Sequence, residues 1–180
     1  MSYLKTLLQR NEDFARDFDA GDLPLAPKQR TIVLSCADTR VDPARIFNLE
    51  LGEVVVISNT GGRVTPGVIN QVSTLAFIGA KLNPDDPRPL ELIIVHHTQC
   101  GTERLADPQL QKAIMDNLGT DVSEIAIHDH QSAFIDDIKH LESSPKIPRQ
   151  LLVSACLYDV TNGKVDQMIA PTPLNQVFAS

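Results

Sequence analysis

Tryptophan is absent from this 180-residue sequence, and aromatic residues make up only 4% of it. Cysteine is scarce as well: three residues, Cys36, Cys100 and Cys156, lie far apart, and an odd, scattered set does not form a disulfide framework. We therefore expect a reducing, intracellular compartment, with the cytoplasm as the default location. In such a compartment, thiols that lie near histidines indicate a metal site or catalysis.

Basic residues are outnumbered, with 16 Lys and Arg against 23 Asp and Glu, and the formal net charge is −7. The sequence therefore lacks the excess of positive charge that is typical of proteins that bind nucleic acid or an anionic membrane. No apolar run approaches the roughly 18 residues that a membrane span needs. The N-terminal stretch MSYLKTLLQRNEDFARDF has charges throughout, unlike a signal peptide. We expect neither a nucleic-acid nor a membrane partner.

The hydrophobic pattern predicts a single α/β domain. Four short apolar runs are candidate strands: 31–36, 53–59, 91–97 and 150–158. The first three are rich in Val and Ile without polar alternation, which is typical of parallel strands covered on both faces. Helical patterns cover 3–18, 66–82 and 121–141. Strands alternating with helices indicate a central, mainly parallel sheet flanked by helices. The predicted units are an N-terminal helical arm (1–30), a catalytic domain (31–171) and a C-terminal tail (172–180).

Candidate metal ligands stand where two of these strands end. Cys36 ends the first run, and His96 and His97 end the third, so the groups meet at one sheet edge. Successive strand residues point to opposite faces, so His96 and His97 cannot both face one site. His97 and Cys100 form an H-x-x-C pair, and Cys36 completes a Cys₂His set.

Three protein ligands with one open position are typical of catalytic zinc, and thiolates with imidazole favour zinc over magnesium or calcium. The sequence thus predicts one Zn²⁺ per chain. Cys156 is an alternative fourth ligand, but its apolar strand favours a small core residue.

Asp38 and Arg40 follow Cys36 at alternate positions, as a carboxylate beside a metal-bound water and its cationic partner would. The alternative is an ordinary surface ion pair. Glycines follow the strand ends as well, and they allow a close backbone approach to a small ligand; a plain glycine turn is the alternative. The predicted substrate-binding positions are Gly61, Gly62 and Gly101.

Four ordered motifs resemble the β-class carbonic anhydrases: CADTRV (36–41), NTGGRVTP (59–66), HHTQCG (96–101) and LYDVTNGKV (157–165). The resemblance implies zinc held by Cys36, His97 and Cys100, with Asp38 and Arg40 as a dyad beside the metal water. It implies attack of zinc-bound hydroxide on CO₂ to give bicarbonate and a proton. It also implies a further strand near the C-terminus, hence about four to five strands in all, and a homodimer or dimer of dimers embraced by the N-terminal helices.

Other functions remain open at this point. Compact relatives of the same family hydrolyse carbonyl sulfide or carbon disulfide with the same zinc set, and the metal motif does not separate these substrates. A non-catalytic zinc protein is less favoured, because it has no use for the Asp38–Arg40 pair. A dithiol redox protein is disfavoured by the lack of C-x-x-C. The cluster His128, Asp129 and His130 is expected to be a solvated helical face, with a proton shuttle as the alternative.

Overall fold

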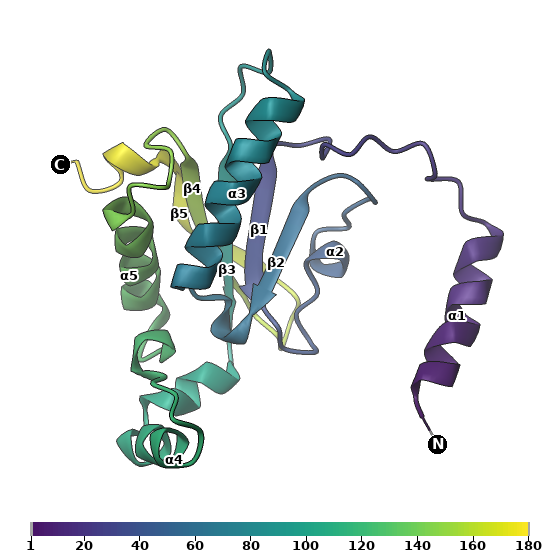
Figure 1. Ribbon diagram of the computed structural model, residues 1–180. Coiled ribbons are helices and arrows are strands. Elements are labelled where there is room, and N and C mark those ends of the chain that lie inside the picture. The colour runs from purple at the N-terminus through teal and green to yellow at the C-terminus, as the bar shows by residue number, and fades with distance from the viewer. Residues whose placement is uncertain (1, 180) are drawn as a thin grey trace.

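The computed structural model describes residues 2–179; Met1 and Ser180, the outermost residues of the predicted arm and tail, lie outside the described residues. A five-stranded sheet with the order β2-β1-β3-β4-β5 forms the centre of the molecule (Figure 1). Its strands are β1 (Thr31–Cys36), β2 (Val55–Asn59), β3 (Glu91–His97), β4 (Leu152–Tyr158) and β5 (Val165–Pro173). The first four strands are parallel, and β5 runs antiparallel to β4. The predicted fold class is confirmed.

Helices α3 and α5 cover one face of this sheet (Figure 1), and their apolar residues share one core with the strands. The helices are α1 (Leu4–Arg16), α2 (Pro43–Ile46), α3 (Pro66–Leu82), α4 (Pro108–Leu118) and α5 (His130–Ser143). Short 3₁₀ turns are η1 (Thr60–Gly62), η2 (Gly101–Ala106), η3 (Ser123–Ile125) and η4 (Leu174–Gln176). Alternate residues of β3, Leu92 and Ile94, point into this core, so strand alternation directs His96 toward the helices and His97 away from them.

Most predicted elements agree with the structure. The bounds 31–36, 91–97 and 66–82 are confirmed, whereas β2 and β4 each begin two residues later than predicted. The start of α3 is fixed by Thr65, whose hydroxyl accepts a hydrogen bond from the Val68 amide at 3.3 Å. Helices α2 and α4 were not predicted.

The prediction of one helix over 121–141 is wrong in its first half. Helix α5 begins at His130, because the Asp129 carboxylate accepts a hydrogen bond from the Ser132 amide at 2.8 Å and caps the helix there. Residues 121–129 form η3 and a loop instead. His128 and Asp129 therefore do not lie on the helical face that the sequence pattern suggested.

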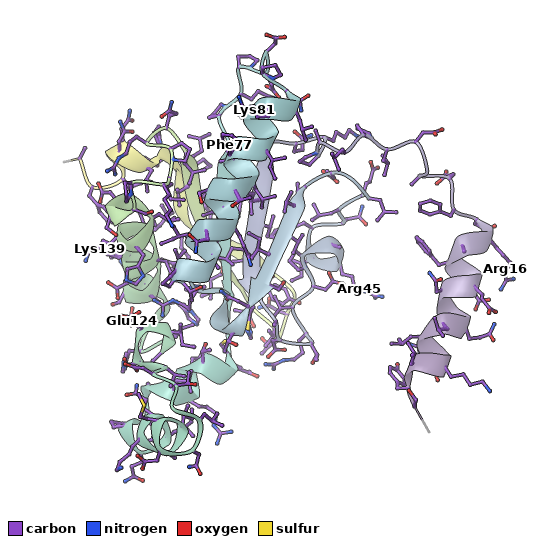
Figure 2. The ribbon with its side chains drawn as sticks, in the orientation of Figure 1. Arg16, Arg45, Phe77, Lys81, Glu124 and Lys139 are labelled. Atoms are coloured by element: carbon purple, nitrogen blue, oxygen red, sulfur yellow. The ribbon has the colours of Figure 1, made fainter. Side chains whose placement is uncertain are left out.

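Helix α1 stands apart from the sheet at the end of an extended segment (Figures 1 and 2), and none of its residues is buried. Strand β5 continues two residues beyond the predicted domain end at 171, and Leu174 after it is fully buried. The division into arm, domain and tail stays a prediction. Among residues 2–179, no helix combines the length and the apolar character that crossing a membrane requires.

Candidate metal centre

The side chains of Cys36, His97 and Cys100 gather at the carboxyl ends of β1 and β3. The two strands are neighbours in parallel register, with Ser35 opposite Val95, so the residues that follow them emerge side by side. The three potential ligand atoms all lie within 4.8 Å of one another, and the residues are buried. This arrangement could hold one metal ion.

The imidazole of His97 is oriented for a metal at Nε2. Its Nδ1 donates a hydrogen bond to the Thr98 carbonyl at 3.0 Å, which places the ring proton on Nδ1. Nε2 is buried and has no hydrogen-bond partner among the described residues. A buried lone pair without a partner is rare in folded proteins, and a metal ion would satisfy it.

His96 points the other way and takes no part in this cluster. Its Nε2 lies 3.2 Å from Asp137, and its ring stacks on Phe134 with the centroids 4.1 Å apart. Burial lowers the pKa of His96, so the ring is neutral. His96 is thus a packing residue of the helix-covered face.

The two thiols of the cluster lie within hydrogen-bonding distance of each other. The sulfur atoms of Cys36 and Cys100 lie 3.9 Å apart, and the Thr102 hydroxyl lies 2.9 Å from the Cys100 sulfur. The hydrogen bond to Cys100, together with burial, raises the pKa of Cys36, while the same bond, with help from His97 and Thr102, lowers the pKa of Cys100. A second thiolate at this distance needs a cation beside it. The donor set of two thiolates and one imidazole fits zinc.

Asp38 lies at the edge of the cluster as a fixed anion. Arg40 donates from Nε to Oδ1 at 2.9 Å and from Nη2 to Oδ2 at 2.8 Å. These hydrogen bonds hold the pKa of Asp38 far below its usual range. A further bond from Arg40 to the Gln99 carbonyl, at 3.1 Å, ties the pair to the H-x-x-C loop. The carboxylate is therefore ionised at neutral pH, and Arg40 links it to the H-x-x-C loop.

A cavity of about 310 Å³ opens beside these residues. Two of the predicted glycines, Gly61 and Gly101, line it together with Cys36, Asp38 and Cys100. The third, Gly62, is buried behind the site and is not among the lining residues. The structure therefore places Gly61 and Gly101 against the cavity and Gly62 behind it.

Thr98 and Cys156 lie outside the metal cluster. The Thr98 hydroxyl accepts from the Val160 amide at 3.2 Å and donates to Asp159 at 3.4 Å, which ties the H-x-x-C loop to the end of β4. Cys156 on β4 is half-buried and lines a separate groove with Val33 and Phe47. The structure does not bring Cys156 to the other two cysteines.

Comparison with known proteins agrees with this arrangement. Residues 31–144, more than half of the chain, match the family model described as carbonic anhydrase. The chain belongs to the β-carbonic anhydrase family. Family membership makes it an enzyme of the carbonic anhydrase class, a lyase.

Individual relatives of this β-carbonic anhydrase align with nearly the whole chain. The chain is 27% identical over 171 residues to β-carbonic anhydrase 1 of Mycobacterium tuberculosis. The alignment covers 93% of this chain and 99% of the relative. A carbon disulfide hydrolase of Saccharolobus solfataricus is 25% identical over 191 residues, covering 91% and 87% of the two chains. The crystal structure of carbonic anhydrase from Streptococcus mutans superposes with a TM-score of 0.78 at 28% identity, covering 93% and 98%.

Sequence reasoning missed one buried pair of this β-carbonic anhydrase, Arg63 and Asp137. Arg63 Nε lies 3.0 Å from both carboxylate oxygens of Asp137, and the pair is almost inaccessible to solvent. One signal was available: Asp137 falls on the same helical stripe as Phe134 and Leu141, where a charged residue is out of place unless it has a partner.

Proposed function

We propose that this protein is a zinc carbonic anhydrase that converts CO₂ and water reversibly to bicarbonate and a proton. The observation that carries this proposal is the position of Asp38. Its Oδ2 lies 4.0 Å from Nε2 of His97, beside a three-ligand set that leaves one coordination position free. A structural zinc site has no use for a carboxylate in that place.

Cys36, His97 and Cys100 would hold the zinc, which when bound supplies a Lewis acid that activates water at neutral pH. Ionised Asp38 can only accept hydrogen bonds, so a water molecule at the free position must donate to it. Such a bond would orient the water beside the cavity. Arg40 occupies both carboxylate oxygens and keeps Asp38 from becoming a proton donor.

The cavity has room for a small uncharged molecule. Apolar atoms of Ala37 and Leu105 form part of its lining, and Gly61 and Gly101 present backbone without side chains. A linear electrophile such as CO₂ requires no charged partner to enter, and the glycines allow it to approach the ligand cluster closely.

A second candidate function is the hydrolysis of carbonyl sulfide or carbon disulfide at the same centre. The similarity to a carbon disulfide hydrolase over 91% of this chain supports it. These gases are linear electrophiles as well, and zinc held by Cys36, His97 and Cys100 would supply the same Lewis-acid chemistry for their hydrolysis. Sulfur is larger than oxygen, so the width of the cavity separates the candidates.

The rates of turnover for CO₂, carbonyl sulfide and carbon disulfide, measured on one zinc-quantified preparation, decide between these functions. We expect kcat/KM to be highest for CO₂. A higher value for either sulfur compound replaces carbonic anhydrase with the second candidate. Zinc binding without turnover of any of the three gases would indicate a non-catalytic zinc protein.

We also propose that the chain acts as a homodimer or a dimer of dimers. Helix α1 exposes Leu4, Leu7 and Leu8 and buries none of its residues, so its apolar side needs a partner. Phe77 on the outer side of α3 (Figure 2) is 66% exposed. The structure of two tetrameric β-carbonic anhydrases from Sordaria macrospora shares the fold, with a TM-score of 0.64 at 21% identity. Light scattering should give a dimer or larger, and Leu7→Glu with Leu8→Glu should shift it to a monomer.

The cytoplasm is the proposed location. Cys36, Cys100 and Cys156 are all free cysteines. Two of them are needed as thiolates for the metal, and a reducing compartment keeps thiols available.

A further inference from the structure

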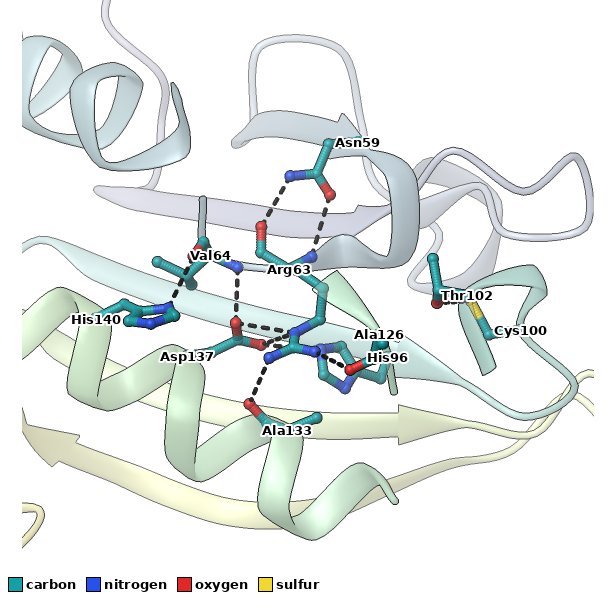
Figure 3. Close-up of polar contacts among 10 residues, drawn as sticks. All are labelled: Asn59, Arg63, Val64, His96, Cys100, Thr102, Ala126, Ala133, Asp137 and His140. Carbon is teal, nitrogen blue, oxygen red and sulfur yellow. Dashed lines mark hydrogen bonds and ion pairs between the residues drawn. The ribbon is translucent and has the colours of Figure 1, made fainter. Parts of the chain in front are cut away.

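The carboxylate of Asp137 on α5 is fully buried behind the metal centre, where it accepts hydrogen bonds from two other parts of the chain (Figure 3). From the segment after η1, the Val64 amide donates at 2.8 Å and Arg63 Nε at 3.0 Å. From the end of β3, His96 Nε2 lies at 3.2 Å. One side chain thus joins α5 to both segments that border the ligand cluster.

Arg63 is held along its whole length. Beyond its bonds to Asp137, its Nη1 donates to the Ala126 carbonyl at 2.9 Å, and Nη2 lies 3.5 Å from the Ala133 carbonyl. The Asn59 side chain accepts from the backbone amide of Arg63 at 3.1 Å and donates to its carbonyl at 2.8 Å (Figure 3). These bonds anchor the residue that directly follows η1.

The turn η1 packs closely against the backbone of one proposed metal ligand, Cys36, and against Thr102, which contacts another. A Cβ on Gly62 would lie 3.0 Å from the backbone nitrogen of Cys36, and one on Gly61 would lie 2.9 Å from the Thr102 side chain. The Thr102 hydroxyl in turn lies 2.9 Å from the Cys100 sulfur (Figure 3). The position of η1 consequently sets where the Cys36 backbone and the Thr102 hydroxyl can lie.

The same carboxylate acts on the third ligand through the chain itself. His96 directly precedes His97 on β3, and its ring is clamped between Asp137 and Phe134. Fixing the direction of the His96 side chain fixes the strand end from which His97 points to the opposite face.

A buried ion pair is often no more stabilising than apolar residues of the same volume. Its particular contribution is to fix orientation. The guanidinium bonds Asp137 through Nε and the Ala126 carbonyl through Nη1, and the carboxylate accepts from Val64 as well, so the partners are held in one geometry. Here the segments that the ion pair holds, η1 and the end of β3, lie next to all three proposed ligands.

We propose that Arg63 and Asp137 are positioning residues of the metal centre, which hold η1 and the end of β3 in the arrangement that binds zinc tightly. The inference rests on the proposed function in so far as zinc is the metal of this site. Neither residue would contact the metal or the substrate. Both would act through the segments that they hold in place.

The test is the double variant Arg63→Met with Asp137→Asn. The new amide oxygen can still accept from the Val64 amide, while both buried charges and the contact of Arg63 Nε with the carboxylate disappear together. Zinc affinity is measured by competition with a chromophoric chelator, and the geometry of the thiolate ligands by the visible absorption of the Co²⁺-substituted protein. We expect the zinc dissociation constant to rise about 10- to 100-fold, as for other residues that orient metal ligands, and the Co²⁺ bands to shift.

Leu141→Ala is the matched control. Leu141 is fully buried on the same helix, and its truncation destabilises the core without removing any hydrogen bond of Arg63, Asp137 or His96. It should lower the melting temperature of the metal-free protein and leave zinc affinity and the Co²⁺ spectrum unchanged. Arg63→Lys keeps the charge but not the fork that reaches both Asp137 and Ala126, so it should give a smaller loss of affinity in the same direction.

Wild-type zinc affinity and an unshifted Co²⁺ spectrum in the double variant overturn the inference. If that variant does not fold, unchanged values in Arg63→Lys overturn it equally. Equal losses in Leu141→Ala would assign the effect to stability alone and overturn it too. A wild-type protein that binds no zinc contradicts the proposed function itself, and so is distinguishable from these outcomes.

Discussion

Asp38 Oδ2 lies 4.0 Å from Nε2 of His97, while both oxygens of the same carboxylate accept hydrogen bonds from Arg40. The distance is too long for a good hydrogen bond between the two side chains. It leaves room for a third group that contacts both, which under the proposed function would be a metal ion with its water.

Asp38→Ala should abolish most of the activity without removing the metal. Asp38 is not one of the three clustered ligands, so zinc content should stay at one per chain. Loss of the acceptor that orients the water should lower the rate of CO₂ hydration about 10²- to 10⁴-fold, the usual range for a positioned acid or base. Stopped-flow assays with metal analysis on the same samples measure both quantities. Full activity in this variant would reject the role given to Asp38.

Asp38 should not titrate between about pH 4 and pH 9, because its hydrogen bonds from Arg40 hold its pKa far below the usual value near 3.9. A pKa that is lower in the folded protein than in the unfolded chain stabilises the fold at pH values above the pKa of the unfolded chain. This contribution is lost as the pH falls through the pKa of the folded protein. It is small, since the side chain is 19% exposed and its partner 46% exposed. Carboxyl NMR can follow the residue. Arg40→Leu should bring its titration back near pH 4, and a wild-type pKa of 4 or more would contradict the pairing.

Removal of a ligand should remove the metal. Cys36→Ala and His97→Ala should each purify with far less than one zinc per chain, because two protein ligands hold zinc much more weakly than three. Cys156→Ser is the control, since its sulfur lies outside the cluster and the metal content should not change. Elemental analysis gives the stoichiometry. Full zinc content in both ligand variants would place the metal elsewhere.

Gly62→Ala should destabilise the protein more than Gly163→Ala. Both glycines have positive φ, +67° and +75°, so both variants carry the backbone strain of about 1 kcal/mol. Only at Gly62 would the new Cβ meet backbone atoms, Cys36 N and Val95 O, each at 3.0 Å. We expect a further loss of about 1–3 kcal/mol in the free energy of unfolding for this overpacking. Denaturant unfolding of the metal-free variants measures it, and equal losses would show that the turn can yield.

Local signals in the sequence predicted the parts of the fold that depend on neighbouring residues. The Thr65-Pro66 start gave helix 66–82 correctly, and uninterrupted Val and Ile runs gave β1 and β3. A similar start at Asp107-Pro108, with Gly119 in the left-handed conformation at the end, marks α4 and was overlooked. At Asp129 the capping side chain determined the helix start, and the apolar pattern alone placed it too early.

The candidate metal cluster could be assembled from the sequence because strand ends in a parallel sheet meet at one edge. The ion pair of Arg63 and Asp137 could not, because its partners are 74 residues apart and belong to a turn and a helix whose contact no local pattern encodes. The direction of His96 followed from strand alternation, but its partner on α5 did not.

The most direct test of the central claim is a zinc titration of the metal-free protein with CO₂ hydration measured at each addition. If Cys36, His97 and Cys100 form the catalytic metal centre, the rate should rise in proportion to added zinc and reach its limit at one zinc per chain. A rate that stays at the uncatalysed level at full zinc occupancy, or that does not depend on zinc, would contradict the account.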